Sequence, residues 1–179
     1  MKTITSVTAM LLLLTSAAFA DDTDYLKATI LTADALDTAM AEAPADQVSD
    51  QPMTHVESTE GRLGVGVVHR PLIAAGGPIN GIRHHKQSEV YRVMAGSGTL
   101  VTSKSMTERN ELPADGYVVT NLTGPSDVGV IVDVESSQVI GEGDIVIIPA
   151  GLAHGFSEIT EVITYMVVRV DPERLVALK

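Results

Sequence analysis

The sequence predicts an all-β fold, a sandwich or a barrel, preceded by one short helix. Short runs that are apolar, or that alternate between apolar and polar residues, are separated by turn residues along most of the chain. Such spacing is typical of antiparallel β architectures and not of alternating βαβ units. The runs are Thr54–Ser58, Arg62–Arg70, Glu89–Thr102, Gly116–Leu122, Val128–Val134, Asp144–Ile148 and Val162–Val170.

The predicted helix lies in a lead-in over residues 21–60. Thr32 is a suitable N-cap, Leu36 and Met40 fall four residues apart on one face, and Pro44 ends the pattern. We expect the β domain over residues 61–171 and a short tail over 172–179. Within the long run from Glu89, the residues Gly96-Ser97-Gly98 are expected to form a hairpin turn.

The first residues of the chain have the layout of a secretory signal. Lys2 supplies a positive start, the apolar stretch Met10–Leu14 is too short to span a bilayer, and Ala18-Phe19-Ala20 has the small-residue pattern of a cleavage site. We therefore expect residues 1–20 to be removed and the mature chain to begin at Asp21. The expected location is secreted or periplasmic, without stable membrane insertion.

Composition excludes several classes of function. A formal charge of -11 makes binding to nucleic acid or to anionic lipid unfavourable, so neither is expected. The absence of cysteine excludes disulfides and thiol chemistry. Stability must then come from the core and the polar network, or from a metal or a partner subunit.

The stretch from Arg83 to Leu100 carries ionisable residues inside a strand-like pattern. In one continuous strand, alternate side chains share a face, so His85 and Glu89 point the same way, and His84 points toward solvent. Inward ionisable groups are costly unless they are paired or bound to a metal. From these residues alone, a hydrogen-bonded pair and a metal site both stay open.

A second stretch, Gly141–Glu158, combines with the first to resemble the cupin family. Four of its residues match the family's second motif: Gly143, Pro149, Gly151 and His154. Three match the first motif: His85, Glu89 and Gly96. Two positions depart from the pattern, because Glu158 stands where asparagine is usual and Arg83 stands in place of the first histidine.

This resemblance covers roughly residues 62–170 and implies a small antiparallel barrel, a double-stranded β-helix or jelly roll, with a metal inside. The implied ligands are His85, Glu89 and His154. Two imidazoles and one carboxylate with open positions suit Fe(II), with Mn, Ni or Zn as competitors. Parity favours His85, but another alignment of the motif makes His84 the ligand, and a bulge at the barrel rim would turn both imidazoles inward.

Other side chains near these motifs have candidate roles. Tyr91 is a candidate proton donor, although a core tyrosine with a satisfied hydroxyl is an equal alternative. Arg83 is a candidate fork for a substrate carboxylate, or it pairs with a nearby acid. Gln87 is a candidate pocket residue, either a further metal ligand or a residue that orients a ligand. Phe156 is expected in the pocket wall.

The resemblance favours an exported metal-binding cupin, an enzyme that acts on a small polar molecule. Oxidation of the dioxygenase type is favoured over isomerase or lyase chemistry, because three ligands leave room for substrate and oxygen. A module that binds a small ligand without turnover and a metal-free barrel are the alternatives. The segment between the motifs, 103–140, is expected to add a hairpin near the barrel mouth. The resemblance also suggests a homodimer through edge-strand pairing.

Overall fold

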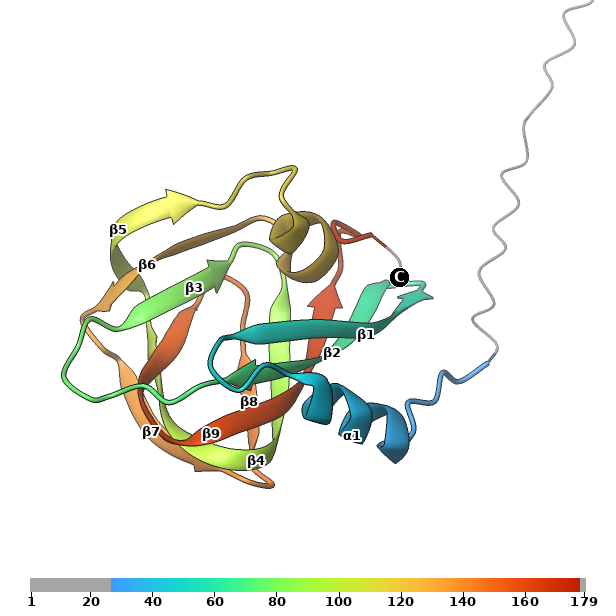
Figure 1. Cartoon of the computed structure of the whole chain (residues 1–179). Helices are drawn as coiled ribbons and strands as arrows, with labels where there is room; N and C mark the ends of the chain where they lie inside the picture. The colour runs from blue at the N-terminus through green and yellow to red at the C-terminus, as the bar shows by residue number, and fades with distance from the viewer. Residues whose placement is uncertain (1–26, 178–179) are drawn as a thin grey trace, which may run out of the picture.

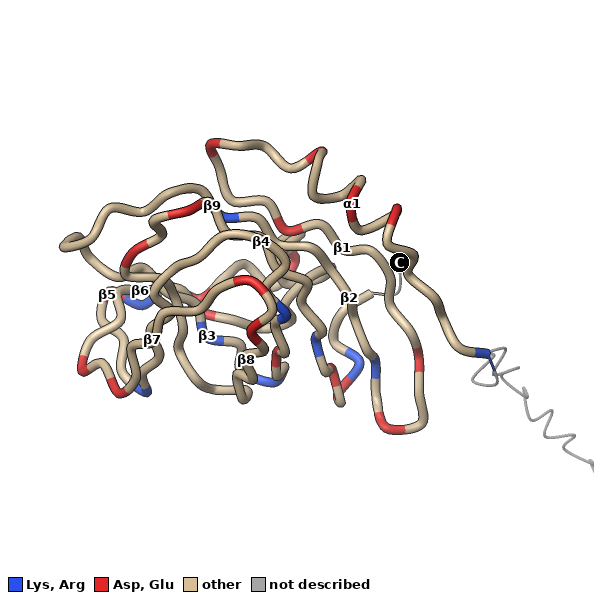
Figure 2. Tube along the Cα trace, turned by 90° about the horizontal axis from the view of Figure 1, so that it is seen from below, with Lys and Arg blue, Asp and Glu red and all other residues tan. Residues whose placement is uncertain are grey.

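The computed structural model describes residues 27–177, so the predicted leader and its cleavage site lie outside the described residues. The first element is α1 (Ala33–Glu42), as the sequence predicts. The Thr32 hydroxyl accepts a hydrogen bond from the backbone nitrogen of Ala35 at 3.3 Å, which satisfies a free amide of the first turn. Acidic residues lie along the helix (Figure 2), and Asp34 in its first turn complements the helix dipole.

The rest of the described chain is mainly antiparallel strand, with one π-helical turn. The strands are β1 (Ser49–Ser58), β2 (Gly61–Arg70), β3 (Asn80–His84), β4 (Ser88–Ser103), β5 (Ser105–Glu111), β6 (Ser126–Val132), β7 (Ser136–Gly141), β8 (Ile145–Ile148) and β9 (Ala153–Asp171). The π-helical turn is Val119–Thr123. Among residues 27–177 no helix is long and apolar enough to cross a membrane.

Two long strands, β4 and β9, run through both halves of the barrel (Figure 1). One half has the order β1-β2-β9-β4-β8, and the other has the order β5-β6-β3-β9-β4-β7. The register from Ser88 opposite Val170 to Ser103 opposite Ala153 shifts repeatedly, so both strands bend between the halves. The result is the antiparallel jelly-roll barrel that the sequence predicts, although its sheet is not strictly closed.

The apolar core lies between the two halves. It is built from inward residues of β2, β4, β7, β8 and β9, and Tyr91 stacks on Tyr165 with ring centroids 4.2 Å apart. Alternation along each strand places these side chains inside and leaves polar residues outside. The core packs against β4 and β9 and so supports the buried polar residues that these two strands carry.

Two local expectations are wrong. Gly116–Leu122 is not a strand but leads into the π-helical turn. There the side chain of Thr120 donates to the carbonyl of Gly116 and that of Asn121 to the carbonyl of Tyr117, so local side-chain bonds replace a ladder. Gly96 is not in a hairpin turn; it has a φ of 75° inside the continuous strand β4, where the register shifts.

The segment between the two motifs adds a hairpin of β5 and β6, as expected. These strands pair from Ser105 opposite Val132 to Glu111 opposite Asp127, with an irregularity after Thr107. Earlier in the chain, β1 pairs with β2 along its whole length. The second half of the lead-in is therefore part of the sheet.

Candidate metal centre

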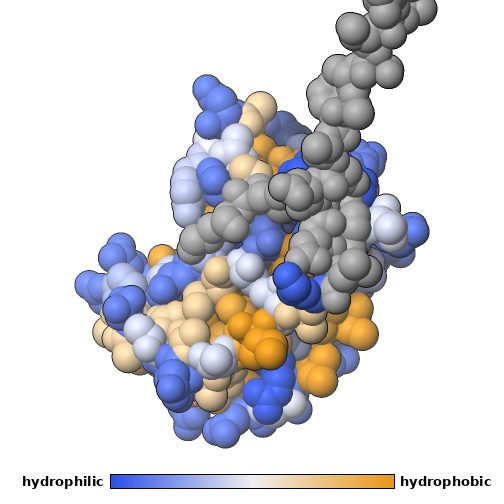
Figure 3. Space-filling view, turned by 90° about the vertical axis from the view of Figure 1, so that its right-hand side faces the viewer, coloured by the Kyte–Doolittle hydropathy of each residue, from blue (hydrophilic) through white to orange (hydrophobic). Residues whose placement is uncertain are grey.

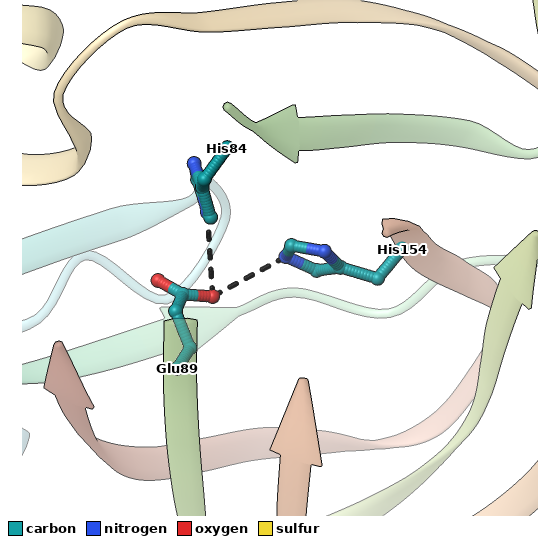
Figure 4. A group of neighbouring side chains, drawn as sticks. All are labelled: His84, Glu89 and His154. Carbon is teal, nitrogen blue, oxygen red and sulfur yellow. Dashed lines mark ion pairs between the residues drawn. The ribbon is translucent and has the colours of Figure 1, made fainter. Parts of the chain in front are cut away.

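Three buried side chains from separate strand ends meet at one point (Figure 4). His84 ends β3, Glu89 is the second residue of β4, and His154 is the second residue of β9. The Nε2 atoms of both histidines lie 3.3 Å from Glu89 Oε2. Glu89 is 1% exposed and each histidine is 3% exposed. The structure thus brings together Glu89 and His154, as expected, with His84 as the third member.

The expectation that His85 shares the face of Glu89 is wrong. The His85 side chain is 30% exposed, and its Nε2 lies 3.3 Å from Asp127 and 3.5 Å from Glu111, outside the group of three. A bulge that turns both imidazoles inward is not seen either. His84 is therefore the inward histidine, and the half-buried His85 lies outside the barrel beside β5 and β6.

Parity fails here because the stretch is two strands and not one. β3 ends at His84 and β4 begins at Ser88, with a bend between them. The backbone of Gly151 donates to the carbonyl of His84 at 2.7 Å, and that of His85 donates to the carbonyl of Pro125 at 2.9 Å. These contacts end the β3 ladder, so counting alternate residues across the bend assigns the wrong face.

The hydrogen bonds of both imidazoles set their tautomers. His154 Nδ1 lies 3.1 Å from the carbonyl oxygen of Leu152, which can only accept, so Nδ1 carries the hydrogen. His84 Nδ1 lies 2.9 Å from the Ser126 hydroxyl, which has the Gly124 carbonyl at 3.0 Å as its own acceptor. Burial lowers the pKa of His84 and favours its neutral form. Nδ1 of each ring therefore faces an acceptor oxygen, and Nε2 is the ring nitrogen that lies toward Glu89 Oε2.

Arg169 fixes the other oxygen of Glu89. Its Nε donates to Glu89 Oε1 at 2.8 Å, and its terminal nitrogens bind Asp50 at 3.2 and 2.7 Å. Tyr91 donates its hydroxyl to Glu89 Oε2 at 2.7 Å. Burial opposes the charge on Glu89, but the contacts with His84, Arg169 and His154 outweigh it and hold the pKa well below its usual range. Glu89 is therefore a carboxylate with one oxygen held and one presented to the histidines.

This donor set fits a divalent transition metal. Two nitrogen lone pairs directed at one carboxylate oxygen repel each other and the oxygen unless a cation or a proton lies among them. Ligands bound to one such metal at about 2.0–2.2 Å lie roughly 3.0–3.5 Å apart, which the separations of 3.3 Å satisfy. The three donor atoms all lie within 4.8 Å of one another. The bonds from Nδ1 to oxygen are those that orient metal-binding histidines.

Tyr91 lies beside the group as a protonated phenol. Burial raises its pKa well above the ordinary value, and the negative charge of Glu89 adds to the shift. Its hydroxyl hydrogen is directed at Glu89 Oε2, the same oxygen that faces both histidines. This placement fits both sequence-based interpretations of Tyr91, a candidate proton donor and a core tyrosine with a satisfied hydroxyl.

Arg83 does not reach this group; of its two candidate roles, the structure shows the pairing with a nearby acid and not the substrate fork. Its Nε and terminal nitrogen bind both oxygens of Asp127, at 3.0 and 2.9 Å. Arg109 also donates to Asp127, which is fully buried. The histidine and carboxylates at His85, Glu111 and Asp127 do not fit a metal, because both Asp127 oxygens are held by guanidinium groups.

Gln87 and Phe156 also serve the structure rather than a pocket wall. The buried Gln87 amide, with its nitrogen turned to the two acceptors, donates to the carbonyls of Leu122 and Thr123 and holds the π-helical turn. Phe156 lies in the core, with the guanidinium of Arg70 at 5.6 Å from its ring centroid. Neither residue lines the two cavities at the site.

Two cavities lead to the group of three. An inner cavity of about 50 Å³ is lined by His84, Glu89 and His154. An outer cavity of about 500 Å³ opens among β3, β5 and β6. Three residues line both cavities and mark where they adjoin: Arg70, Ile82 and His154. The outer cavity is of a size that takes a small molecule.

The sequence reasoning missed three charged residues at the inner cavity: Asp50, Arg70 and Arg169. A signal existed for the two arginines, because each follows an apolar run, in GVGVVHR and YMVVR. A charged residue on the inward face of an apolar strand needs a buried partner. Asp50 offered no such signal, because its neighbours in sequence are polar.

No protein-family model matches the chain, and no curated protein matches it. Among solved structures, BH2720 from Bacillus halodurans is 12% identical, covers 86% of this chain and 94% of that chain, and has a TM-score of 0.48. A Cupin 2 conserved barrel domain protein from Salinispora arenicola is 16% identical, with coverages of 81% and 90% and a TM-score of 0.42. A recombinant oxalate oxidase in complex with glycolate is 18% identical, with coverages of 75% and 55% and a TM-score of 0.40. Likenesses of this size carry no argument, and the jelly-roll fold rests on the strand order and register described above.

Proposed function

We propose that this protein is a metal-dependent enzyme of the cupin type that acts on a small polar molecule. The observation that carries the proposal is the convergence of His84 Nε2, His154 Nε2 and Glu89 Oε2, all buried, beside a cavity that opens outward. These three atoms would hold a divalent transition metal, with Fe(II) favoured and Mn, Ni or Zn as competitors. When bound, the metal supplies Lewis acidity or activates oxygen.

The chain's own residues would prepare the site in three ways. Arg169 and the two Nδ1 bonds orient the three donors before any metal binds. Burial excludes bulk water from the donors, which strengthens charge interactions at the site. Tyr91, whose protonated hydroxyl donates to Glu89 Oε2, would be the proton donor beside the bound ligand.

Dioxygenase-like oxidation is favoured over isomerase or lyase chemistry for one reason. Three protein ligands leave positions open for both a substrate and oxygen. A barrel that binds a small ligand without turnover is the alternative, and the same cavities support it. Metal-loaded protein that binds a small molecule but converts none of a broad panel, with and without oxygen, would favour the alternative.

Elemental analysis of protein purified without an affinity tag tests the metal site. We expect close to one equivalent of a first-row transition metal in the wild type and a large loss in His84→Ala and in His154→Ala. His85→Ala is the matched control, because it removes the neighbouring imidazole outside the group. Full metal in both inner variants would refute the site.

Export and location are proposals that lie on residues 1–26, outside the described chain. The pattern of Lys2, the apolar stretch and Ala18-Phe19-Ala20 supports cleavage before Asp21. Intact-mass analysis of protein from the periplasm or medium is expected to show a first residue of Asp21. Retention of Met1 on exported protein contradicts this.

A homodimer through an outer sheet edge is also a proposal. Within the described chain, β8 pairs only with β4, and its outward residues Ile145 and Ile147 are 66% and 72% exposed. Figure 3 shows hydrophobic residues gathered on one face of the molecule. An apolar edge strand is a natural pairing site for a second copy. Light scattering is expected to report a dimer that Ile147→Lys converts to a monomer; a monomeric wild type contradicts it.

A further inference from the structure

Arg70 differs from the other arginines near the site in what its guanidinium contacts. Its Nε donates to the Tyr165 hydroxyl at 2.9 Å. Within residues 27–177, no hydrogen bond or ion pair engages its two terminal nitrogens. Arg83 and Arg169, in contrast, have their forks filled by Asp127 and Asp50. Arg70 therefore keeps its bidentate donor face unused.

The unused donor face lies where the two cavities adjoin. Arg70 lines both of them, together with His154 of the candidate metal centre. Tyr165 and the Phe156 ring hold the guanidinium from the core side. A guanidinium fixed on one side and open on the other is preorganised for a planar or tetrahedral oxyanion.

The charges around the inner cavity point to the same sign of ligand. Its carboxylates, Glu89 and Asp50, are both bound by Arg169. The two carboxylates are negative, and Arg169 and Arg70 are positive, so these four charges cancel. A divalent metal at His84 and His154 would leave surplus positive charge in a buried space, and an anionic ligand removes that surplus. Glu108 is the one carboxylate lining the outer cavity, and it is exposed to solvent at the rim.

We propose that the ligand of this site is a small organic anion whose carboxylate or phosphate group pairs with the fork of Arg70. This assignment deepens the proposed function and rests on it, because the ligand lies in the outer cavity with its charged end toward the metal. The outer cavity of about 500 Å³ receives the rest of the molecule between Ile82 and the polar rim residues Asn80 and Asn110.

Calorimetric titration of the metal-loaded full chain tests the assignment with matched pairs of probes. Succinate is compared with succinamide, and glycerol 3-phosphate with glycerol, so that each pair differs mainly in charge. We expect at least one anion to bind at least about tenfold more tightly than its neutral partner. The pair that shows the larger preference identifies carboxylate or phosphate as the group.

Variants of Arg70 then locate the preference. Arg70→Gln is expected to abolish the anion preference, and Arg70→Lys to retain part of it, because a lysine keeps the charge but loses the fork. Arg92→Gln is the control, since Arg92 is exposed on β4 and lines neither cavity. Melting curves and metal content are measured for every variant, so that loss of fold is distinguished from loss of the fork.

Two results overturn the anion assignment: no anion binds the metal-loaded wild type below about 10 mM, or the preference survives in Arg70→Gln. An Arg70-dependent preference in protein that loads no metal would support the anion assignment and refute the metal centre instead. The two proposals therefore fail separately.

Discussion

Arg169 donates to Glu89 Oε1 at 2.8 Å, and this contact leaves Oε2 of the same carboxylate facing the imidazole of His154 at 3.3 Å. These two partners of Glu89, Arg169 and His154, both come from β9, one from near each end of that strand. The bends in β9 are what bring these ends to one carboxylate. Glu89 is consequently half of a buried ion pair and also the central member of the candidate metal centre.

Replacement of the inward histidine separates metal binding from general stability. His84→Ala is expected to lose most of the bound metal and to melt several degrees lower, because a ligand that binds only the folded state stabilises it. His85→Ala is expected to keep both properties near those of the wild type. Elemental analysis and thermal melts check this, and a chelator should remove most of the melting difference. Equal metal in the two variants contradicts the assignment.

Removal of the guanidinium beside Glu89 is expected to destabilise the fold strongly. Arg169→Met leaves the buried Glu89 and the half-buried Asp50 without their cation, which costs about 3–5 kcal/mol in the free energy of unfolding. Lys86→Met serves as the control, because the pair between Lys86 and Glu173 is on the surface, with side chains 53% and 50% exposed. That change is expected to cost about 0–1 kcal/mol. Urea unfolding at neutral pH measures both, and similar values would refute the distinction.

Asp127 is expected to make stability depend on pH in the acid range. Burial opposes its charge, but the guanidinium groups of Arg83 and Arg109 outweigh this and hold its pKa below the ordinary value. The folded state therefore releases this proton more readily than the unfolded state does. The stabilisation is full above the unfolded pKa of about 3.9 and is lost as the pH falls through the lower, folded pKa.

Urea unfolding at a series of pH values from about 5 down to about 2.5 measures this contribution. Asp127→Asn is expected to be less stable than the wild type at the upper end of the series, with a difference that shrinks toward the lower end. Glu111→Gln, whose side chain is 63% exposed, is the control. A difference that stays constant with pH for Asp127→Asn contradicts the assignment.

The close approach of β3 to β9 predicts a sensitive glycine. These strands pair only through Gly81 opposite Gly155 and Ile82 opposite His154. A Cβ at Gly81 would lie 2.6 Å from Ile131 Cδ1 and 2.9 Å from the carbonyl oxygen of His154. Gly81→Ala is expected to cost about 1–3 kcal/mol and to reduce metal content, because it pushes His84 and His154 apart.

Gly77→Ala is the control for this glycine, since a Cβ there meets no atom within 4 Å. It is expected to leave unfolding and metal content unchanged. Unfolding in urea and elemental analysis are measured on the same preparations. Full metal and unchanged stability in Gly81→Ala would show that the two strands have room to separate without effect on the site.

Local pattern was enough to predict the helix at Thr32, most of the strands and the inward placement of Glu89, whereas the inward placement of His154 was implied by the resemblance to the cupin family. Capping, alternation and turn residues act over a few positions, so they can be read along the chain. The same rules failed at Gly116–Leu122, where hydroxyl and amide side chains bind their own backbone. They also failed at Gly96, where the strand bends without reversing.

Only the tertiary structure decided which histidine and which arginine enter the site. The choice of His84 over His85 follows from the end of β3 and from the contacts of Gly151 and Pro125 with that bend, which come from distant parts of the chain. Arg83 is drawn away from the site because Asp127 lies opposite it on β6. Long-range strand pairing determines these neighbours, and alternation within one segment contains no information about which segment will lie beside it.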